Sequence, residues 1–91
     1  MDNAVSLDAA ETKGLTSLVA GRADILVAPH LEAGNILAKL LSFLANADSA
    51  GLVLGARVPI ILTSRADSVR SRIASCAVAV LAAHARRRAL A

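Results

Sequence analysis

The chain has 91 residues and a formal net charge of +3; 56% of its residues are hydrophobic, and only Phe43 is aromatic. This length allows one small domain at most, and so high a hydrophobic share favours a core segment covered by further protein or an oligomer interface. The near absence of aromatic rings argues against a single-stranded nucleic-acid binder. The excess charge equals that of residues 86–88, which suit a solvated helix end better than a nucleic-acid or acidic membrane contact.

The sequence also argues against a membrane span, secretion and a cysteine-rich site. The longest apolar stretch, residues 73–83, is shorter than the ~20 residues that cross a bilayer. The N-terminal residues are acidic and polar, unlike a signal peptide, so we expect a cytoplasmic protein. The lone Cys76 excludes an internal disulfide and a multi-cysteine metal site, and the sequence has neither another metal cluster nor a nucleotide-binding fingerprint.

The N-terminal third predicts a short helix followed by a buried strand. The segment LDAAETK has helix signals at both ends, with Ser6 as N-cap and Gly14 as the stop. Residues 23–28 form a continuous apolar run that Pro29 closes. A run of this length suits a strand that is buried on both faces.

The remainder predicts two helices around two further strands. Residues 32–46 place apolar side chains on one helical face. Residues 51–54 and 58–63 are apolar runs of strand length, and a final helix starts near residues 64–68. Its expected buried stripe consists of Val69, Ile73, Cys76, Ala77, Val80 and Leu81. The order α-β-α-β-β-α favours an α/β fold with a largely parallel sheet.

The segment TSRADS combines features of an anion-binding site. Ser64 and Asp67 have the capping-box spacing [ST]-x-x-[DE], so Ser64 could simply cap the final helix while Arg65 is solvated. Alternatively, the end of a buried strand, a helix N-terminus and the Arg65 guanidinium together form a site for phosphate or carboxylate. The sequence leaves both interpretations open.

Three other positions have a structural and a functional interpretation. Gly34 lies in the first turn of a predicted helix, where close packing on the neighbouring strand is favoured over contact with a ligand. His30 follows the first predicted strand, yet no metal ligand or acid partner lies at the right spacing, so we expect a surface residue. Cys76 falls on the apolar stripe and is expected in the core.

Two segments carry a family resemblance. The sequence PHLEAGNILAK at residues 29–39 resembles the Pro-Asp-x-x-x-Gly-Asn-x-x-x-Lys segment of the phosphate acetyl/butyryltransferase family. GLVLGARVPIILTSRADS at residues 51–68 resembles its Gly-x-x-x-Gly…Pro…Ser-Arg segment, in the form typical of butyryl-type and fused members. Residues 2–26 also resemble the stretch that precedes these segments, so the resemblance covers nearly the whole chain.

The resemblance implies an acyltransferase that interconverts acyl-CoA and phosphate with CoA and acyl phosphate. It implies a homodimer with an α/β fold akin to isocitrate and isopropylmalate dehydrogenases, with CoA as a substrate and no metal or prosthetic group. By resemblance, Ser64 holds the CoA thiol or the reacting carbonyl and Arg65 binds phosphate. Gly34, Asn35 and Asp67 are further substrate-binding candidates.

The resemblance also predicts where the chain belongs in the whole enzyme. It corresponds to the C-terminal part of the catalytic region, and the family's crossover between two domains falls near residues 51–55. We therefore expect the chain alone to be inactive and the stripe of the final helix to lack its native partner surface. The alternative is a non-catalytic interaction module that oligomerises through its apolar surface.

The sequence departs from the family pattern at two positions. Acetyl-type members have an aspartate seven residues after the serine, the proposed base for the CoA thiol, where this chain has Ser71. The nearest carboxylate is that of Asp67, and the sequence does not identify it as the base. His30 stands where the family usually has aspartate.

Overall fold

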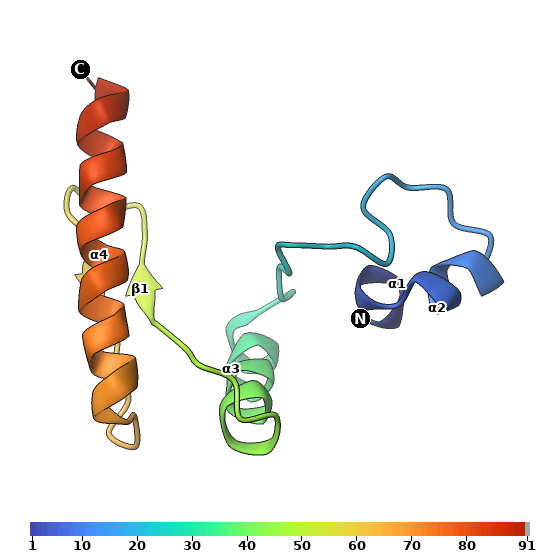
Figure 1. Cartoon of the computed structure of the whole chain (residues 1–91), viewed down its shortest axis with the longest axis horizontal. Coiled ribbons are helices and arrows are strands. Elements are labelled where there is room, and N and C mark those ends of the chain that lie inside the picture. Colours follow the sequence, from blue (N-terminus) through green and yellow to red (C-terminus); the bar gives the residue numbers. More distant parts are fainter. Residues whose placement is uncertain (91) are drawn as a thin grey trace. The chain divides into compact units, whose positions relative to one another are not determined.

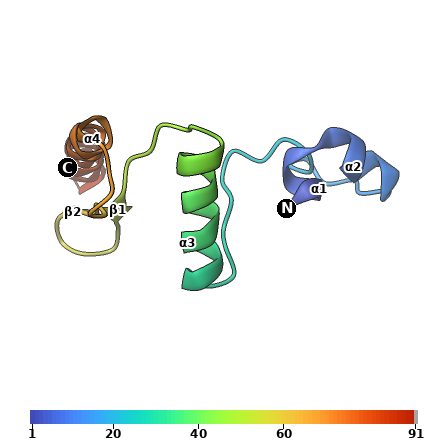
Figure 2. The ribbon, with the colours of Figure 1, turned by 90° about the horizontal axis from the view of Figure 1, so that it is seen from below.

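The computed structural model describes residues 1–90, which form two separate units, Met1–Leu37 and Ala38–Ala91. Figures 1 and 2 show the elements in chain order. They are the helices α1 (Asp2–Val5), α2 (Leu7–Thr12) and α3 (Leu31–Lys39), the π-helical turn η1 (Leu40–Leu44), the strands β1 (Leu52–Val53) and β2 (Ile60–Ile61), and the helix α4 (Val69–Leu90).

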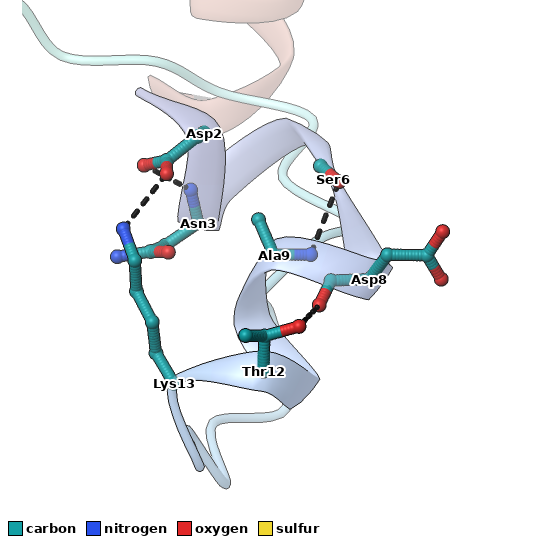
Figure 3. Close-up of polar contacts among 7 residues, drawn as sticks. All are labelled: Asp2, Asn3, Ser6, Asp8, Ala9, Thr12 and Lys13. Carbon is teal, nitrogen blue, oxygen red and sulfur yellow. Dashed lines mark hydrogen bonds and ion pairs between the residues drawn. The ribbon is translucent and has the colours of Figure 1, made fainter.

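The predicted first helix is confirmed as α2, with the expected signals at both ends. The Ser6 hydroxyl accepts a hydrogen bond from the Ala9 N–H at 3.2 Å, which is an N-cap (Figure 3). Gly14 has a φ of +68°, and its N–H donates to the Glu11 carbonyl while the Leu15 N–H donates to the Ala10 carbonyl. This pair of bonds is a Schellman motif, which satisfies the carbonyls at the end of the helix.

The loop after α2 folds back onto α1. The Gly21 N–H donates to the Asn3 carbonyl at 2.7 Å, and the Ala23 N–H donates to the Ala4 carbonyl at 3.0 Å. Gly21 has a φ of +76°, and a Cβ at this position would lie 2.5 Å from the Leu7 Cα. Both the dihedral angle and the close approach therefore require glycine here.

The predicted strand at residues 23–28 is wrong for this structure, because the segment is an extended connection without a strand partner. Ile25 and Val27 are 81% and 88% exposed, so the expected burial on both faces is also absent. A strand needs a neighbouring strand for its backbone N–H and C=O groups. Among the described residues no strand pairs with this segment.

The predicted second helix is confirmed, with a change of geometry in its last turn. It begins as α3 at Leu31 and continues as η1 to Leu44, where the Ala45 N–H donates to the Leu40 carbonyl five residues back. Asn46 then takes a φ of +52°, which ends the helix. The apolar face expected to be buried is largely exposed, with Leu37 as its half-buried member.

The second unit contains a two-stranded sheet covered by α4 (Figure 2). The strands β1 and β2 pair antiparallel, with Leu52 opposite Ile61 and Val53 opposite Ile60. The expectation of strands at 51–54 and 58–63 is confirmed in place, although each strand is shorter. The expected largely parallel sheet is not what these two strands form, because a six-residue connection, 54–59, returns the chain directly as a hairpin.

The helix α4 packs on the sheet through small side chains rather than through the expected stripe. Ser75 is buried and Ala74, Ala79, Ala82 and Ala83 are half-buried. The predicted stripe is exposed, with Ile73 and Val80 at 64% and 68%, and Cys76 is exposed rather than in the core. The predicted exposure of this stripe is therefore observed, while the missing partner surface stays a prediction. None of the helices among residues 1–90 has the length and apolar character to cross a membrane.

One buried hydroxyl joins α4 to the start of β1. The Ser75 side chain is 1% exposed, accepts a hydrogen bond from the Gly51 N–H at 3.0 Å and donates to the Ser71 carbonyl at 2.8 Å. Gly51 in turn accepts from the Leu62 N–H at 2.9 Å. A Cβ at Gly51 would overlap the Leu62 carbonyl oxygen, so only glycine fits between the hairpin and the helix.

We expect Ser75→Ala to destabilise the contact between α4 and β1 by about 1–3 kcal/mol, because the Gly51 N–H loses its partner. Hydrogen exchange of the Gly51 amide is the measurement, and its protection should fall accordingly. Ser49→Ala, which removes an exposed hydroxyl in the same unit, is the matched control and should leave Gly51 protected. Equal protection in the two variants would contradict this role.

The ion pair between Asp2 and Lys13 predicts a pH dependence in the first unit (Figure 3). The Lys13 ammonium, 2.7 Å from the carboxylate, and the Asn3 N–H hold the pKa of Asp2 below its ordinary value of 3.8. A lowered folded-state pKa stabilises the unit above the unfolded value, and this contribution is lost as pH falls through the folded value. Lys13→Gln should raise the Asp2 pKa in an NMR titration, and an unchanged titration would contradict the ion pair.

Candidate anion site at the turn before the last helix

The segment from Ser64 to Asp67 forms a closed turn between β2 and α4. The Asp67 carboxylate accepts from the Ser64 N–H at 2.6 Å and from the Ser64 hydroxyl at 3.3 Å. The Asp67 N–H donates to the Ser64 carbonyl at 3.2 Å, and the Ala66 N–H donates to the Ser64 hydroxyl at the same distance. The capping-box spacing in the sequence therefore closes this turn on itself.

Of the two interpretations left open for Ser64, the helix cap is wrong, because Ser68 and not Ser64 caps α4. The Ser71 N–H donates to the Ser68 hydroxyl at 3.1 Å, and the Arg72 N–H donates to the Ser68 carbonyl. The start expected near residues 64–68 is close to the observed Val69. Ser64 is left outside the helix, where its hydroxyl serves the turn.

Three cations surround the Ser64–Asp67 turn. Arg65 lies within it and is exposed. The Lys39 ammonium lies 3.4 Å from the Ser64 hydroxyl, and the Arg72 guanidinium donates to the Ser64 and Asp67 carbonyls at 3.0 and 3.4 Å. The Asp67 carboxylate offsets one of these three positive charges. The turn is therefore a positively charged, partly exposed surface suited to an anion.

Lys39 and Arg72 are the residues that sequence reasoning missed at this turn. Lys39 is the last residue of the segment PHLEAGNILAK, but the sequence of that segment does not show that the Lys39 side chain reaches Ser64. Arg72 lies outside the apolar stripe expected for the final helix, and the sequence alone assigns it no partner. Arg72 is eight residues from Ser64 in the sequence. The two residues come into contact only when both the Ser64–Asp67 turn and the N-terminal end of α4 are folded.

The candidate residues Gly34 and Asn35 lie in the other unit, on α3. A Cβ at Gly34 would lie 3.4 Å from the Ala28 Cβ, an ordinary contact distance, and Asn35 is exposed. Gly34 therefore packs close to Ala28, as the packing interpretation expects, although alanine would also fit at this distance. The structure brings together Ser64, Arg65 and Asp67, while a shared site with Gly34 and Asn35 stays a prediction.

His30 has a local role that explains its position before α3. Its Nδ1 accepts a hydrogen bond from the Ala33 N–H at 3.2 Å, and its carbonyl accepts from the Gly34 N–H. This is the geometry of an N-cap, a position where aspartate is a preferred residue. A histidine that accepts through Nδ1 can thus replace the aspartate of the family pattern as a helix cap.

Ser71 stands at the position of the aspartate of acetyl-type members, and its hydroxyl contacts two other hydroxyls. The Ser71 hydroxyl accepts from the Ser68 hydroxyl at 3.2 Å and lies 3.4 Å from the Ser49 hydroxyl. Both oxygens of the Asp67 carboxylate are bonded to Ser64, which makes Asp67 a structural partner of the serine in this geometry. Among residues 1–90 there is no cluster of three side chains that could hold a metal ion.

The site belongs to the class of polar surfaces that bind an anionic group, because its compact turn carries a hydroxyl, an exposed arginine and two further cations. The family model described as phosphate acetyl/butaryl transferase matches residues 1–80. The chain therefore belongs to the phosphate acetyl/butyryltransferase family. The resemblance stated from the two sequence segments is confirmed.

The curated relatives carry the same family names. A phosphate acetyltransferase of Rhizobium meliloti is 72% identical over 88 residues, which are 97% of this chain and 28% of the relative. A phosphate acetyltransferase of Rickettsia typhi is 65% identical over 78 residues, 86% of this chain and 22% of the relative. A phosphate butyryltransferase of Clostridium beijerinckii is 47% identical over 83 residues, 91% of this chain and 28% of the relative.

The chain thus spans roughly a quarter of the length of these relatives. All three have transferase names, and the alternative of a non-catalytic interaction module has no support among them. The placement of the chain in the C-terminal part of the catalytic region, and the domain crossover near residues 51–55, stay predictions.

The two serines at the start of α4 should respond differently to replacement by alanine. Ser68→Ala should destabilise the first turn of α4 by about 1 kcal/mol, because the Ser71 N–H loses its cap. Ser64→Ala should leave that turn intact, because its hydroxyl bonds only within the preceding turn and to Lys39. Exchange of the Ser71 amide measures the difference, and equal protection in both variants would restore Ser64 as the cap.

Proposed function

We propose that the chain supplies the serine–arginine segment of a phosphate acyltransferase that interconverts acyl-CoA and phosphate with CoA and acyl phosphate. The observation that carries the proposal is the family match together with the turn that holds Ser64 and Arg65 side by side. In the forward reaction a phosphate oxygen attacks the thioester carbonyl, the C–O bond forms and the C–S bond breaks. The sulfur leaves with the electron pair and gains a proton as CoA thiol.

Arg65 is the proposed phosphate ligand. Its guanidinium is exposed and presents a planar fork of donors that matches two phosphate oxygens. Lys39 adds a second positive charge close to the Ser64 hydroxyl. The surplus of cations over the Asp67 carboxylate supports binding of a multiply charged anion.

Ser64 is proposed to hold the CoA thiol or the reacting carbonyl. Its hydroxyl lies between the Asp67 carboxylate at 3.3 Å and the Lys39 ammonium at 3.4 Å. A hydroxyl donates to one partner and accepts from others, so a substrate group can replace either contact without leaving the oxygen unsatisfied. Gly34 and Asn35 remain proposed substrate contacts, from the other segment that resembles the family, residues 29–39.

The remaining expectations belong to the complete enzyme. We propose an isocitrate and isopropylmalate dehydrogenase-like α/β fold, a homodimer and a cytoplasmic location, with CoA as a substrate and no metal or prosthetic group. The proposal includes neither a nucleic-acid nor a membrane partner. Acyl chain length is left open, because relatives with both acetyl and butyryl names match this chain.

Free-thiol release from acetyl-CoA or butyryl-CoA in the presence of phosphate tests the function. The complete enzyme should release thiol only when phosphate is present, and the chain of residues 1–91 should release none. Turnover by the complete enzyme without phosphate would contradict the assigned acceptor. Turnover by the 91-residue chain alone would contradict its role as one segment of a larger site.

Replacement of Arg65 by lysine tests the phosphate ligand. Arg65→Lys in the complete enzyme should raise the apparent KM for phosphate about tenfold, because a point charge replaces a two-pronged donor. Arg57→Lys, at an exposed arginine of the β1–β2 connection, is the matched control and should leave this KM unchanged. An unchanged phosphate dependence in Arg65→Lys would identify Arg65 as a solvated residue.

A further inference from the structure

The Ser64–Asp67 turn needs an attachment to the rest of the unit if it is to present Arg65 in a fixed direction. The turn closes on itself through the bonds between Ser64 and Asp67, which fix its shape but not its orientation. Its flanking backbone is irregular, since β2 ends at Ile61 and α4 begins at Val69. A contact from a regular element to the turn would supply the missing constraint.

Arg72 makes that contact. The side chain reaches back from the first turn of α4, where its Nη2 donates to the Ser64 carbonyl at 3.0 Å and its Nε donates to the Asp67 carbonyl at 3.4 Å. One rigid guanidinium therefore bonds to the first and the last residue of the turn. The backbone N–H of Arg72 donates to the Ser68 carbonyl, so the residue carrying this fork belongs to the helix itself.

The helix that carries Arg72 is itself held against the hairpin. Ser75, three residues further along α4, accepts from the Gly51 N–H at 3.0 Å. The chain of contacts thus runs from β1 through α4 and Arg72 to both ends of the turn. Each link is a hydrogen bond between named atoms, and Arg65 lies between the two carbonyls that Arg72 holds.

We infer that Arg72 is a positioning residue of the phosphate site, which holds the Ser64–Asp67 turn so that Arg65 and the Ser64 hydroxyl are presented in one fixed arrangement. The inference rests on the proposed function. A misplacement of a binding group by about 1 Å can cost on the order of 10²-fold in rate, so loss of this fork should be measurable. Lysine cannot replace it, because an ammonium does not have the planar pair of donors that spans the two carbonyls.

The first experiment uses the 91-residue chain and needs no activity. In Arg72→Gln and Arg72→Lys, the Ser64 amide should exchange about tenfold faster than in the wild type, because the turn opens more often. Arg70→Gln is the matched control, since Arg70 lies on the same helix and pairs with Asp48 at 2.9 Å rather than with the turn. Unchanged exchange at Ser64 in Arg72→Gln would overturn the inference.

The second experiment uses the complete enzyme and separates positioning from folding. Arg72→Gln and Arg72→Lys should raise the apparent KM for phosphate about tenfold and leave the KM for acyl-CoA unchanged, while Arg70→Gln should leave both unchanged. A drop in kcat with both KM values unchanged indicates loss of folded protein and would overturn the inference, as would wild-type behaviour of Arg72→Lys. If the wild-type enzyme forms no acyl phosphate, the proposed function fails, and exchange at Ser64 still decides whether Arg72 holds the turn.

Discussion

The second unit depends on one partly buried hydrogen bond, from the Gly51 N–H to the hydroxyl of the buried Ser75. A backbone donor that is shielded from water needs a partner, and here a helix side chain supplies it for the half-buried Gly51 where the sheet begins. The bond fixes α4 against β1, and the antiparallel register then fixes β2. The end of β2 and the start of α4 set the span of the Ser64–Asp67 turn, and Leu62, directly after β2, is itself bonded to Gly51, so the geometry of the candidate site follows from a contact at the same open end of the hairpin.

The sequence predicted those features that short-range interactions determine. The Ser6 cap and the Gly14 stop of α2, the helix from residue 31 onward and the positions of β1 and β2 were visible in residue type and spacing. The pairing of Ser64 with Asp67 was also predicted from their spacing. That spacing occurs both at the start of a helix and in a closed turn, so it did not distinguish the two. Ser68, one residue beyond the motif, decides that question by capping α4.

The expectations of burial that the chain alone does not fulfil depend on partners far away in the sequence or outside it. Residues 23–28 were predicted as a strand from their apolar run, and their side chains are exposed because no strand among the described residues pairs with them. The stripe through Ile73 and Val80 was identified by its period, while the hairpin packs on the opposite, alanine-rich and serine-containing side of α4. A periodic pattern gives the direction of an apolar face but not the identity of its partner. Lys39 and Arg72 escaped notice for the same reason, because their partners at the turn become neighbours only after folding.

The contrast between the exposed apolar faces and the ordered turn has a physical origin. The turn is held by hydrogen bonds that reach at most eight residues along the chain, apart from the contact of Lys39. Such bonds form without a large core, whereas apolar faces gain stability only when further surface covers them. The family model matches residues 1–80, and the chain spans roughly a quarter of the length of each relative. In the proposed function, the covering surface belongs to the remainder of an acyltransferase. The charged turn is therefore held by bonds within the described residues, whereas the proposed enzyme takes the enclosure that excludes water from the thioester and phosphate from further residues.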